Sequence, residues 1–206
     1  MPIFNKVKKL FSAAFFIMFL LPQTELHSYR VLYAEQFYRL YHIHFYMYPN
    51  DYLENIYYLE QALRADFANP LNALAVIKNK EEWERYRYLF RMHVSVKLVE
   101  LYLGLASKYD KREAYFFNAP WQRENLRSLE VAEETYKYAR VYWDEAVKWN
   151  EFIDESWITL ENIQHWEDQS YRIRENKLNY GAIIDRHLER VSRVKQKFLE
   201  MDETTY

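Results

Sequence analysis

The sequence has 206 residues, contains no cysteine, and has only 2 glycines and 5 prolines. Without cysteine the chain has no disulfide bond, no thiolate nucleophile and no cysteine-ligated zinc. With so few glycines it has no glycine-rich phosphate loop, and it contains neither a Gly-x-Ser-x-Gly nor a His-Glu-x-x-His motif. We therefore predict a protein that is not an enzyme and that binds no cofactor.

The sequence is rich in aromatic side chains, with 20 tyrosines, 13 phenylalanines and 6 tryptophans. Apolar residues recur at spacings of three and four, which predicts an all-α protein of six to eight helices in antiparallel pairs. Residues 83–106 have apolar side chains on two faces, and Gly104 marks a place where another helix comes close. The next predicted helix has a seam of alternating large and small residues, interrupted by the polar Asn150: Leu129, Ala132, Tyr136, Ala139, Trp143, Ala146 and Ile153.

Shorter helices are predicted around this pair. One runs from Pro70 to Ile77, with the proline at its first position. Another is capped by Asp154 or Ser156 and holds Trp157, Leu160, Ile163 and Trp166. Ser170 is expected to begin the last helix, and residues 201–206 to form a frayed tail. The apolar stripe of that last helix consists of Tyr180, Ile184, His187, Val191, Val194 and Phe198.

The N-terminus has the pattern of an export signal. Lys6, Lys8 and Lys9 precede an apolar run from Leu10 to Leu21. This run is shorter than the ~20 residues that cross a bilayer, but no small-x-small cleavage site follows it. We predict a signal peptide or N-terminal anchor at 1–27 and one helical domain at 28–200. The expected location is a bacterial periplasm, with an inner-membrane anchor facing the periplasm as the alternative.

The stretch at about 36–69 resembles the tetratricopeptide repeat, a helix-turn-helix unit of ~34 residues. The matching residues are Tyr46, Asn50-Asp51-Tyr52, Leu59, Ala62-Leu63 and Asp66, whereas Asn55 stands where the repeat has a small residue. The resemblance implies that Tyr46 packs under the turn and that the hairpins stack as a short solenoid or an irregular bundle. A second stretch, at about 120–150, repeats the spacing through Leu126, Ala139, Trp143 and Ala146, and it is either a degenerate repeat or a plain long helix.

The same resemblance implies a scaffold or adaptor that binds a protein partner or its own copy. In the repeat family the partner contacts the first helix, which here gives Phe37, Leu40, His44, Met47 and Tyr48; these residues could equally be ordinary core. Exported, tyrosine-rich helical chains of this kind resemble spirochaetal periplasmic and flagellar-collar proteins. The alternative function is a periplasmic carrier with an aromatic-lined cavity for a small ligand.

Charge is segregated late in the chain. Residues 144–168 are acidic, residues 172–197 are basic, and the net charge of the whole chain is −2. Either the two segments are paired or solvated, or the basic helix docks an acidic partner through Arg186, Arg190 and Arg193. A mildly acidic chain is not expected to bind nucleic acid. Glu161, His165 and Asp168 share a predicted helical face, but no second pair of ligands accompanies them, so no metal site is predicted.

Overall fold

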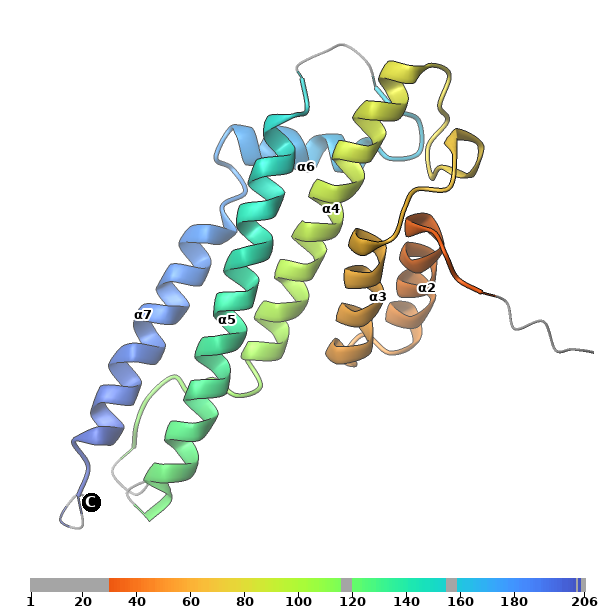
Figure 1. The fold of residues 1–206 in the computed structure, drawn as a ribbon. Helices are drawn as coiled ribbons and strands as arrows, with labels where there is room; N and C mark the ends of the chain where they lie inside the picture. Colours follow the sequence, from red (N-terminus) through yellow and green to blue (C-terminus); the bar gives the residue numbers. More distant parts are fainter. Residues whose placement is uncertain (1–29, 116–119, 155–158, 203, 205–206) are drawn as a thin grey trace, which may run out of the picture. The chain divides into compact units, whose positions relative to one another are not determined.

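Helices make up most of the backbone in the computed structural model, which describes residues 30–115, 120–154, 159–202 and 204. Within these ranges the all-α prediction is confirmed, because there are six α-helices, one 3-10 turn and no strand (Figure 1). Residues 31–206 form one unit, and the predicted export segment at 1–27 lies outside the described residues. The elements are α2 (Ala34–Met47), α3 (Tyr52–Arg64), η1 (Pro70–Asn72), α4 (Lys80–Ala106), α5 (Gln122–Glu151), α6 (Gln164–Arg174) and α7 (Tyr180–Leu199).

Short polar side chains cap the N-termini of several of these helices. Asp51 Oδ1 accepts a hydrogen bond from the Glu54 N–H at 3.3 Å, as the sequence predicts for an N-cap. Asn79 caps α4 by accepting from the Glu82 N–H at 2.8 Å, and Glu82 reaches back to the Lys78 N–H. Asn179 caps α7 in the same way. These contacts satisfy N–H groups that have no partner within the helix itself.

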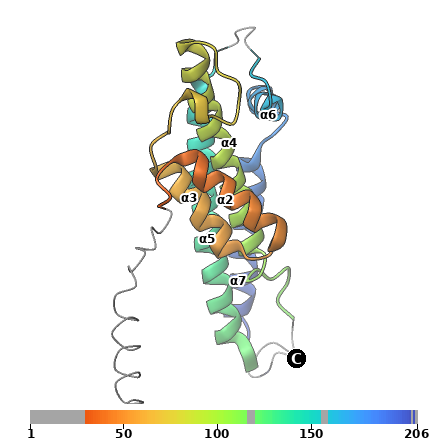
Figure 2. The same ribbon diagram turned by 90° about the vertical axis from the view of Figure 1, so that its right-hand side faces the viewer.

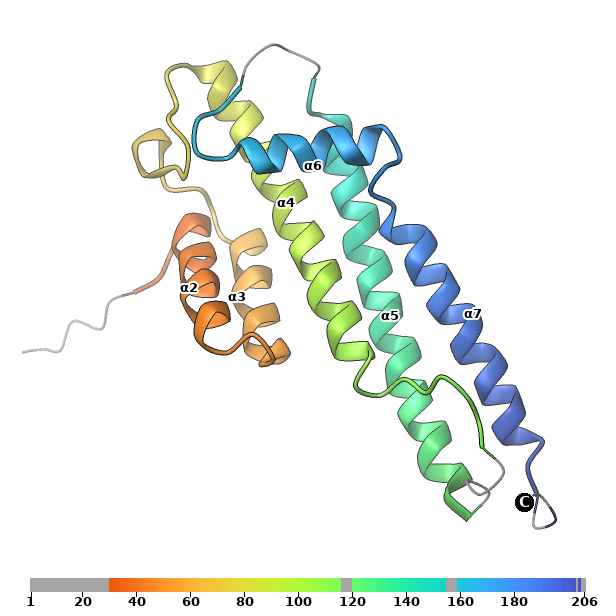
Figure 3. The same ribbon diagram turned by 180° about the vertical axis from the view of Figure 1, so that it is seen from behind.

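Five helices lie side by side in the order α2, α3, α4, α5, α7 (Figures 1 and 3). Helices that follow one another in the sequence are therefore neighbours in space, except that α5 is followed in the row by α7 rather than α6. The view along this row has α2 and α3 nearest the viewer and α6 to one side (Figure 2). Figure 3 shows α6 lying across the first half of α4 and the C-terminal end of α5. Among the described residues, no helix combines the length and the hydropathy that a bilayer span requires.

The α4 helix is central, as its two apolar faces predict. It packs against α3 on one side and α5 on the other, and Tyr86, Phe90 and Leu98 are completely buried. At Gly104 an added Cβ would lie 2.4 Å from the ring of Tyr52 on α3, which confirms the predicted close approach. The hairpin of α2 and α3 therefore packs directly on the long helices.

The predicted seam of α5 is also confirmed. All seven of its residues are buried, and Ala139 has no exposed surface. The α7 helix comes close to this seam, because a Cβ added at Gly181 would lie 2.8 Å from the indole nitrogen of Trp143. The α5 helix continues without a break from Gln122 to Glu151. Of the two interpretations for this stretch, the structure therefore has the single long helix.

The predicted boundaries of the short helices are partly wrong. Only Pro70–Asn72 forms a turn of helix, capped by Asn69, because the exposed Leu71 has no surface to pack on and a short isolated helix is unstable. The α6 helix begins at Gln164 rather than after Asp154 or Ser156, and it contains Ser170, which was expected to begin the last helix. Asn162, with a φ of 75°, is left-handed just before α6 and cannot be part of a helix that starts earlier. Asn176, with a φ of 53°, separates α6 from α7, so that Ser170 belongs to α6.

The structure also corrects the position of Tyr46, which was expected to pack under the turn. Its side chain is 90% exposed. The turn is instead filled by the buried Asn55, whose Nδ2 donates to the Tyr48 carbonyl at 3.0 Å and whose Oδ1 lies 3.1 Å from His44 Nδ1. A carboxamide with two partners thus stabilises this turn in place of the small residue and tyrosine of the repeat.

Candidate functional site

Apolar side chains are exposed at the turn end of the α2–α3 hairpin. Six of them, which we call the hairpin surface, come from the second half of α2, the turn and the first half of α3: Ile43, Tyr46, Met47, Tyr48, Leu53 and Tyr57. Each side chain is at least half exposed, and the most exposed are Tyr46 at 90% and Leu53 at 70%. Single exposed apolar residues are common, but a group of this size marks a candidate interaction site.

The five partner-binding residues predicted on α2 have different environments. Met47 and Tyr48 belong to the hairpin surface. Phe37 and Leu40 are half-buried, and Phe37 packs against the core. His44 is half-buried, bonded to Asn55 and 3.7 Å from Asp51. The structure therefore places two of the five on the exposed surface, whereas the sequence did not single out Leu53 or Tyr57.

Ring and hydroxyl contacts fix the hairpin to the long helices. Glu60 Oε1 on α3 accepts hydrogen bonds from the hydroxyls of Tyr102 on α4 and Tyr142 on α5, both at 2.8 Å. Burial, together with the Glu60 carboxylate, raises the pKa of both phenols, so they remain protonated donors. Their rings also stack, with centroids 5.4 Å apart. One carboxylate thus joins three helices beneath the hairpin.

A buried histidine joins α2, α4 and α6. His93 on α4 is 1% exposed, and its Nε2 lies 2.8 Å from the hydroxyl of Tyr38 on α2. Its Nδ1 lies 2.5 Å from Oε1 of Gln169 on α6, so Nδ1 bears the proton and Nε2 accepts from Tyr38. Trp166 stacks on the ring at 4.8 Å. Burial lowers the pKa of His93 to about 3, which keeps the imidazole neutral.

The three arginines of α7 that could dock an acidic partner have two kinds of environment. Arg186 and Arg193 are exposed. Arg190 is half-buried and donates through Nη2 to Oδ2 of Asp110, which also accepts from the Tyr136 hydroxyl at 2.8 Å. Lys195 pairs with Glu133 at 2.8 Å. Asp110 and Glu133 lie outside residues 144–168. Of the alternatives that the sequence left open, pairing of α7 with the acidic segment therefore does not hold for Arg190 and Lys195.

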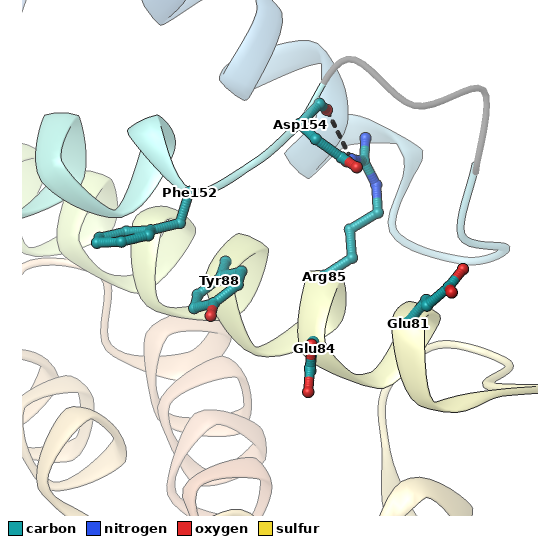
Figure 4. Close-up of a pocket in the computed structure, with 6 residues that line it drawn as sticks. All are labelled: Glu81, Glu84, Arg85, Tyr88, Phe152 and Asp154. Atoms are coloured by element: carbon teal, nitrogen blue, oxygen red, sulfur yellow. Dashed lines mark hydrogen bonds and ion pairs between the residues drawn. The ribbon is translucent and has the colours of Figure 1, made fainter.

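Two members of the acidic segment pair instead with Arg85 of α4. Arg85 Nη1 donates to both the carbonyl oxygen and Oδ1 of Asp154 at 2.8 Å (Figure 4). Its Nε lies 3.4 Å from Oε1 of Glu167. Glu161 precedes α6, so it does not share a helical face with His165 and Asp168. Within the described ranges, no group of three or more His, Asp or Glu side chains is arranged to hold a metal ion.

The long helices coincide with a known family of domains. The model of a family described as a domain of unknown function (DUF8513) matches residues 81–201. The chain belongs to this family. The DUF8513 segment spans nearly all of α4 and the helices through α7, and it leaves the α2–α3 hairpin outside the match. No curated protein and no solved structure matches the chain.

The described residues of the DUF8513 segment line a smaller and a larger cavity. The smaller, of about 230 Å³, is lined by Glu81, Glu84, Arg85, Tyr88, Phe152 and Asp154 (Figure 4). Its arginine is already bonded to Asp154, and its two aromatic rings stack on each other at 5.5 Å. These groups satisfy one another and leave little for a ligand. The larger cavity, of about 430 Å³, lies between the ends of α5 and α6 and includes Asn150. Asn150 was visible in the sequence only as a polar interruption of the apolar seam.

Proposed function

We propose that the protein is an exported, non-enzymatic scaffold or adaptor that holds a protein partner, or a second copy of itself, through the hairpin surface. The observation that supports this most directly is the group of six exposed apolar side chains at one end of a hairpin. Tyrosine and methionine are enriched in protein interfaces, where their large surfaces are buried at the centre of the contact.

The attachment of the hairpin supports the same proposal. A binding surface gains affinity when it is already ordered before the partner arrives. Glu60 joins the hairpin to α4 and α5, and Asn55 closes its turn. Tyr52 packs against Gly104 on α4. The hairpin surface therefore stands on a backbone that is tied at its turn and along its length.

Photo-crosslinking in the native cell tests the proposal. A photoreactive benzoylphenylalanine in place of Tyr48 should crosslink to a defined partner or to a second copy. The matched control replaces Tyr138 on α5, which is equally exposed at 57% against 58% for Tyr48 but lies outside the hairpin. Combining the Tyr48 probe with Tyr46→Ser and Leu53→Ser should remove the product. Identical products from both positions, or none from Tyr48 in a strictly monomeric protein, would refute the proposal.

The compartment needs its own test. A reporter fused after Arg30 should appear in the periplasm if residues 1–27 direct export, because the charged and apolar parts of the signal are both retained. N-terminal sequencing of the mature protein separates a cleaved signal from an anchor. Retention of the fusion in the cytoplasm would contradict the proposed location and leave the docking proposal to be judged by its own experiment.

A second candidate function, a carrier of a small ligand, is favoured by one observation. The cavity at the ends of α5 and α6 has a volume within the ~300–1,000 Å³ typical of ligand sites. Its lining differs from the aromatic cavity that the sequence suggested, because its walls are aliphatic and charged.

A further inference from the structure

Five arginines in the described helices are half-buried, and their environments differ. Three of them form an ion pair with an aspartate: Arg85 with Asp154, Arg140 with Asp185, and Arg190 with Asp110. The other two, Arg87 and Arg91 on α4, have no carboxylate within 4 Å and no hydrogen-bond partner in the part of the chain that the structure describes. A cation that is partly removed from water without a counter-ion destabilises the folded protein.

Arg87 and Arg91 lie on one face of α4, because residues four apart are neighbours on a helix. Each guanidinium packs on an aromatic ring. Cζ of Arg87 lies 5.9 Å from the ring centre of Trp83, and Cζ of Arg91 lies 4.5 Å from that of Trp149 on α5. Arg91 also lies 5.7 Å from the ring centre of Phe67, which follows α3. These rings replace part of the water around each cation and hold the two side chains in place.

The charges around this pair do not neutralise it. Burial and the neighbouring Arg87 lower the pKa of Arg91, and the carboxylates of Asp66 and Glu145 offset only part of that effect. Glu145 is instead paired with Lys148 at 3.4 Å. Among the guanidinium nitrogens of the pair, only Nε of Arg87 is fully buried without a partner. The terminal nitrogens of both arginines therefore remain accessible to an anion from outside the chain.

The charge and shape of the pair indicate which anion. Two guanidinium groups bring two positive charges and two planar forks of donors. A carboxylate has one negative charge, whereas a phosphate monoester has about −1.5 to −2 at pH 7 and three acceptor oxygens. A phosphate monoester can therefore neutralise both cations and accept hydrogen bonds from each of them.

We propose that Arg87 and Arg91 bind a phosphate monoester group, carried either by a small molecule or by a phosphorylated side chain. Its oxygens accept hydrogen bonds from the terminal nitrogens of both arginines, and the rings of Trp83, Phe67 and Trp149 keep those donors in position. This binding activity goes beyond the scaffold role and does not depend on the hairpin surface. It also accounts for two adjacent unpaired cations, since binding sites commonly retain groups that reduce stability.

Nuclear magnetic resonance titration of the full chain with phenyl phosphate tests the proposal, at pH 7.5 and at an ionic strength held constant with potassium chloride. The Nε–H signals of Arg87 and Arg91 and the indole signals of Trp83 and Trp149 should shift at concentrations up to about 10 mM, the range of weak small-ligand binding. Benzoate has the same ring but a single charge, and it should bind at least about tenfold more weakly. A short phosphotyrosine peptide distinguishes the two sources: tighter binding than phenyl phosphate assigns a phosphorylated protein, and equal or weaker binding a small ester.

Variants assign the binding to the pair. Arg87→Gln and Arg91→Gln should each weaken the binding of phenyl phosphate by at least about tenfold, because a charged donor is lost. Arg193→Gln removes the same charge from an exposed site on α7 and should bind as the wild type does. Arg91→Lys retains the charge without the planar fork and should weaken binding by a smaller factor, so that the proposal can be tested even if a glutamine variant does not fold.

Three outcomes would overturn the proposal. The first is the absence of shifts with phenyl phosphate, and the second is equal binding of benzoate. The third is unchanged binding by folded Arg87→Gln and Arg91→Gln, which would show that the two arginines only pack on their aromatic neighbours.

Discussion

Acidification should destabilise this protein through His93, and the size of the effect follows from the burial of that residue. The imidazole lies between Tyr38 and Gln169 under Trp166, and burial lowers its pKa from 6.5 to about 3. In the unfolded chain the same imidazole titrates near its ordinary value. Between these two pKa values the unfolded state binds a proton that the folded state excludes. Stability is therefore fully present above about pH 6.5 and is lost as the pH falls toward 3.

The expected loss is about 1.4 kcal/mol for each pH unit below 6.5. At pH 5 this amounts to about 2 kcal/mol relative to pH 7.5, or a fall of roughly 4–8 °C in the unfolding midpoint for a domain of this size. The pKa values of His42, His165 and His187 are also lowered, chiefly by burial, so they add to the loss with the same sign. The contribution of His93 must therefore be isolated by a variant.

His93→Gln provides that comparison, because glutamine retains hydrogen-bonding groups for Tyr38 and Gln169 but does not titrate. Urea unfolding, followed by circular dichroism and tryptophan fluorescence, should be measured between pH 5 and 7.5 for both proteins. The variant should start less stable and lose about 2 kcal/mol less on acidification. The control His42→Gln removes another histidine of α2 and leaves His93 in place, so it should retain the part of the pH dependence that belongs to His93. An identical loss in His93→Gln and wild type would refute the reasoning.

Three further substitutions test the packing and the surface charges. Ala139→Leu should lower the free energy of unfolding by about 1–3 kcal/mol in a denaturant titration, because the seam has no space for the added atoms. The control Ala182→Leu, at an exposed position, should have little effect. Equal denaturation midpoints for Ala139→Leu and the wild type would show that the seam is open to solvent. Arg190→Glu should lower stability by roughly 3 kcal/mol, because it leaves a buried carboxylate without its cation. Arg193→Glu, one turn further along α7, should leave the unfolding midpoint nearly unchanged, and equal losses in the two variants would contradict the ion pair. Glu60→Ala removes the acceptor of two phenol hydroxyls and so loosens the hairpin from α4 and α5. Amide hydrogen exchange should become faster in α2 and α3, whereas α7 should stay protected. Faster exchange in all helices alike would instead indicate global unfolding.

The sequence predicts the long helices because their apolar spacing extends over many turns. The two faces of α4 and the seam of α5 follow directly from side-chain type, and burial confirms both. Asp51 and Gly104 were also predicted, since a capping carboxylate and a close helix approach each require a particular kind of residue. Strong local patterns of this kind depend little on the rest of the fold.

The remaining boundaries depend on single residues whose backbone conformation the pattern does not reveal. Asn162 and Asn176 adopt left-handed backbone on either side of α6. Asparagine is also favoured at helix N-caps, so the residue type alone does not reveal a left-handed position. The pairing of Arg190 with Asp110 was equally hidden, because 80 residues separate the two side chains. The hairpin surface was predicted only in part: the sequence singled out Met47 and Tyr48, but their exposure depends on how α2 packs against the other helices. The cavities could not be predicted, because residues from several helices line them together.

The hairpin lies outside the DUF8513 match, but its contacts show that it is part of the same folded unit. Tyr38 of α2 packs against Phe90 at 5.4 Å and Trp166 at 5.8 Å, and it donates to the buried His93. Without α2, this histidine would lose its donor and these rings would become exposed, which would destabilise α4 and α6 as well. The hairpin therefore stabilises the DUF8513 segment and also carries the exposed apolar side chains of the hairpin surface. A partner bound to the hairpin, as proposed above, would contact an element that Tyr38, His93 and Gln169 join to α4 and α6.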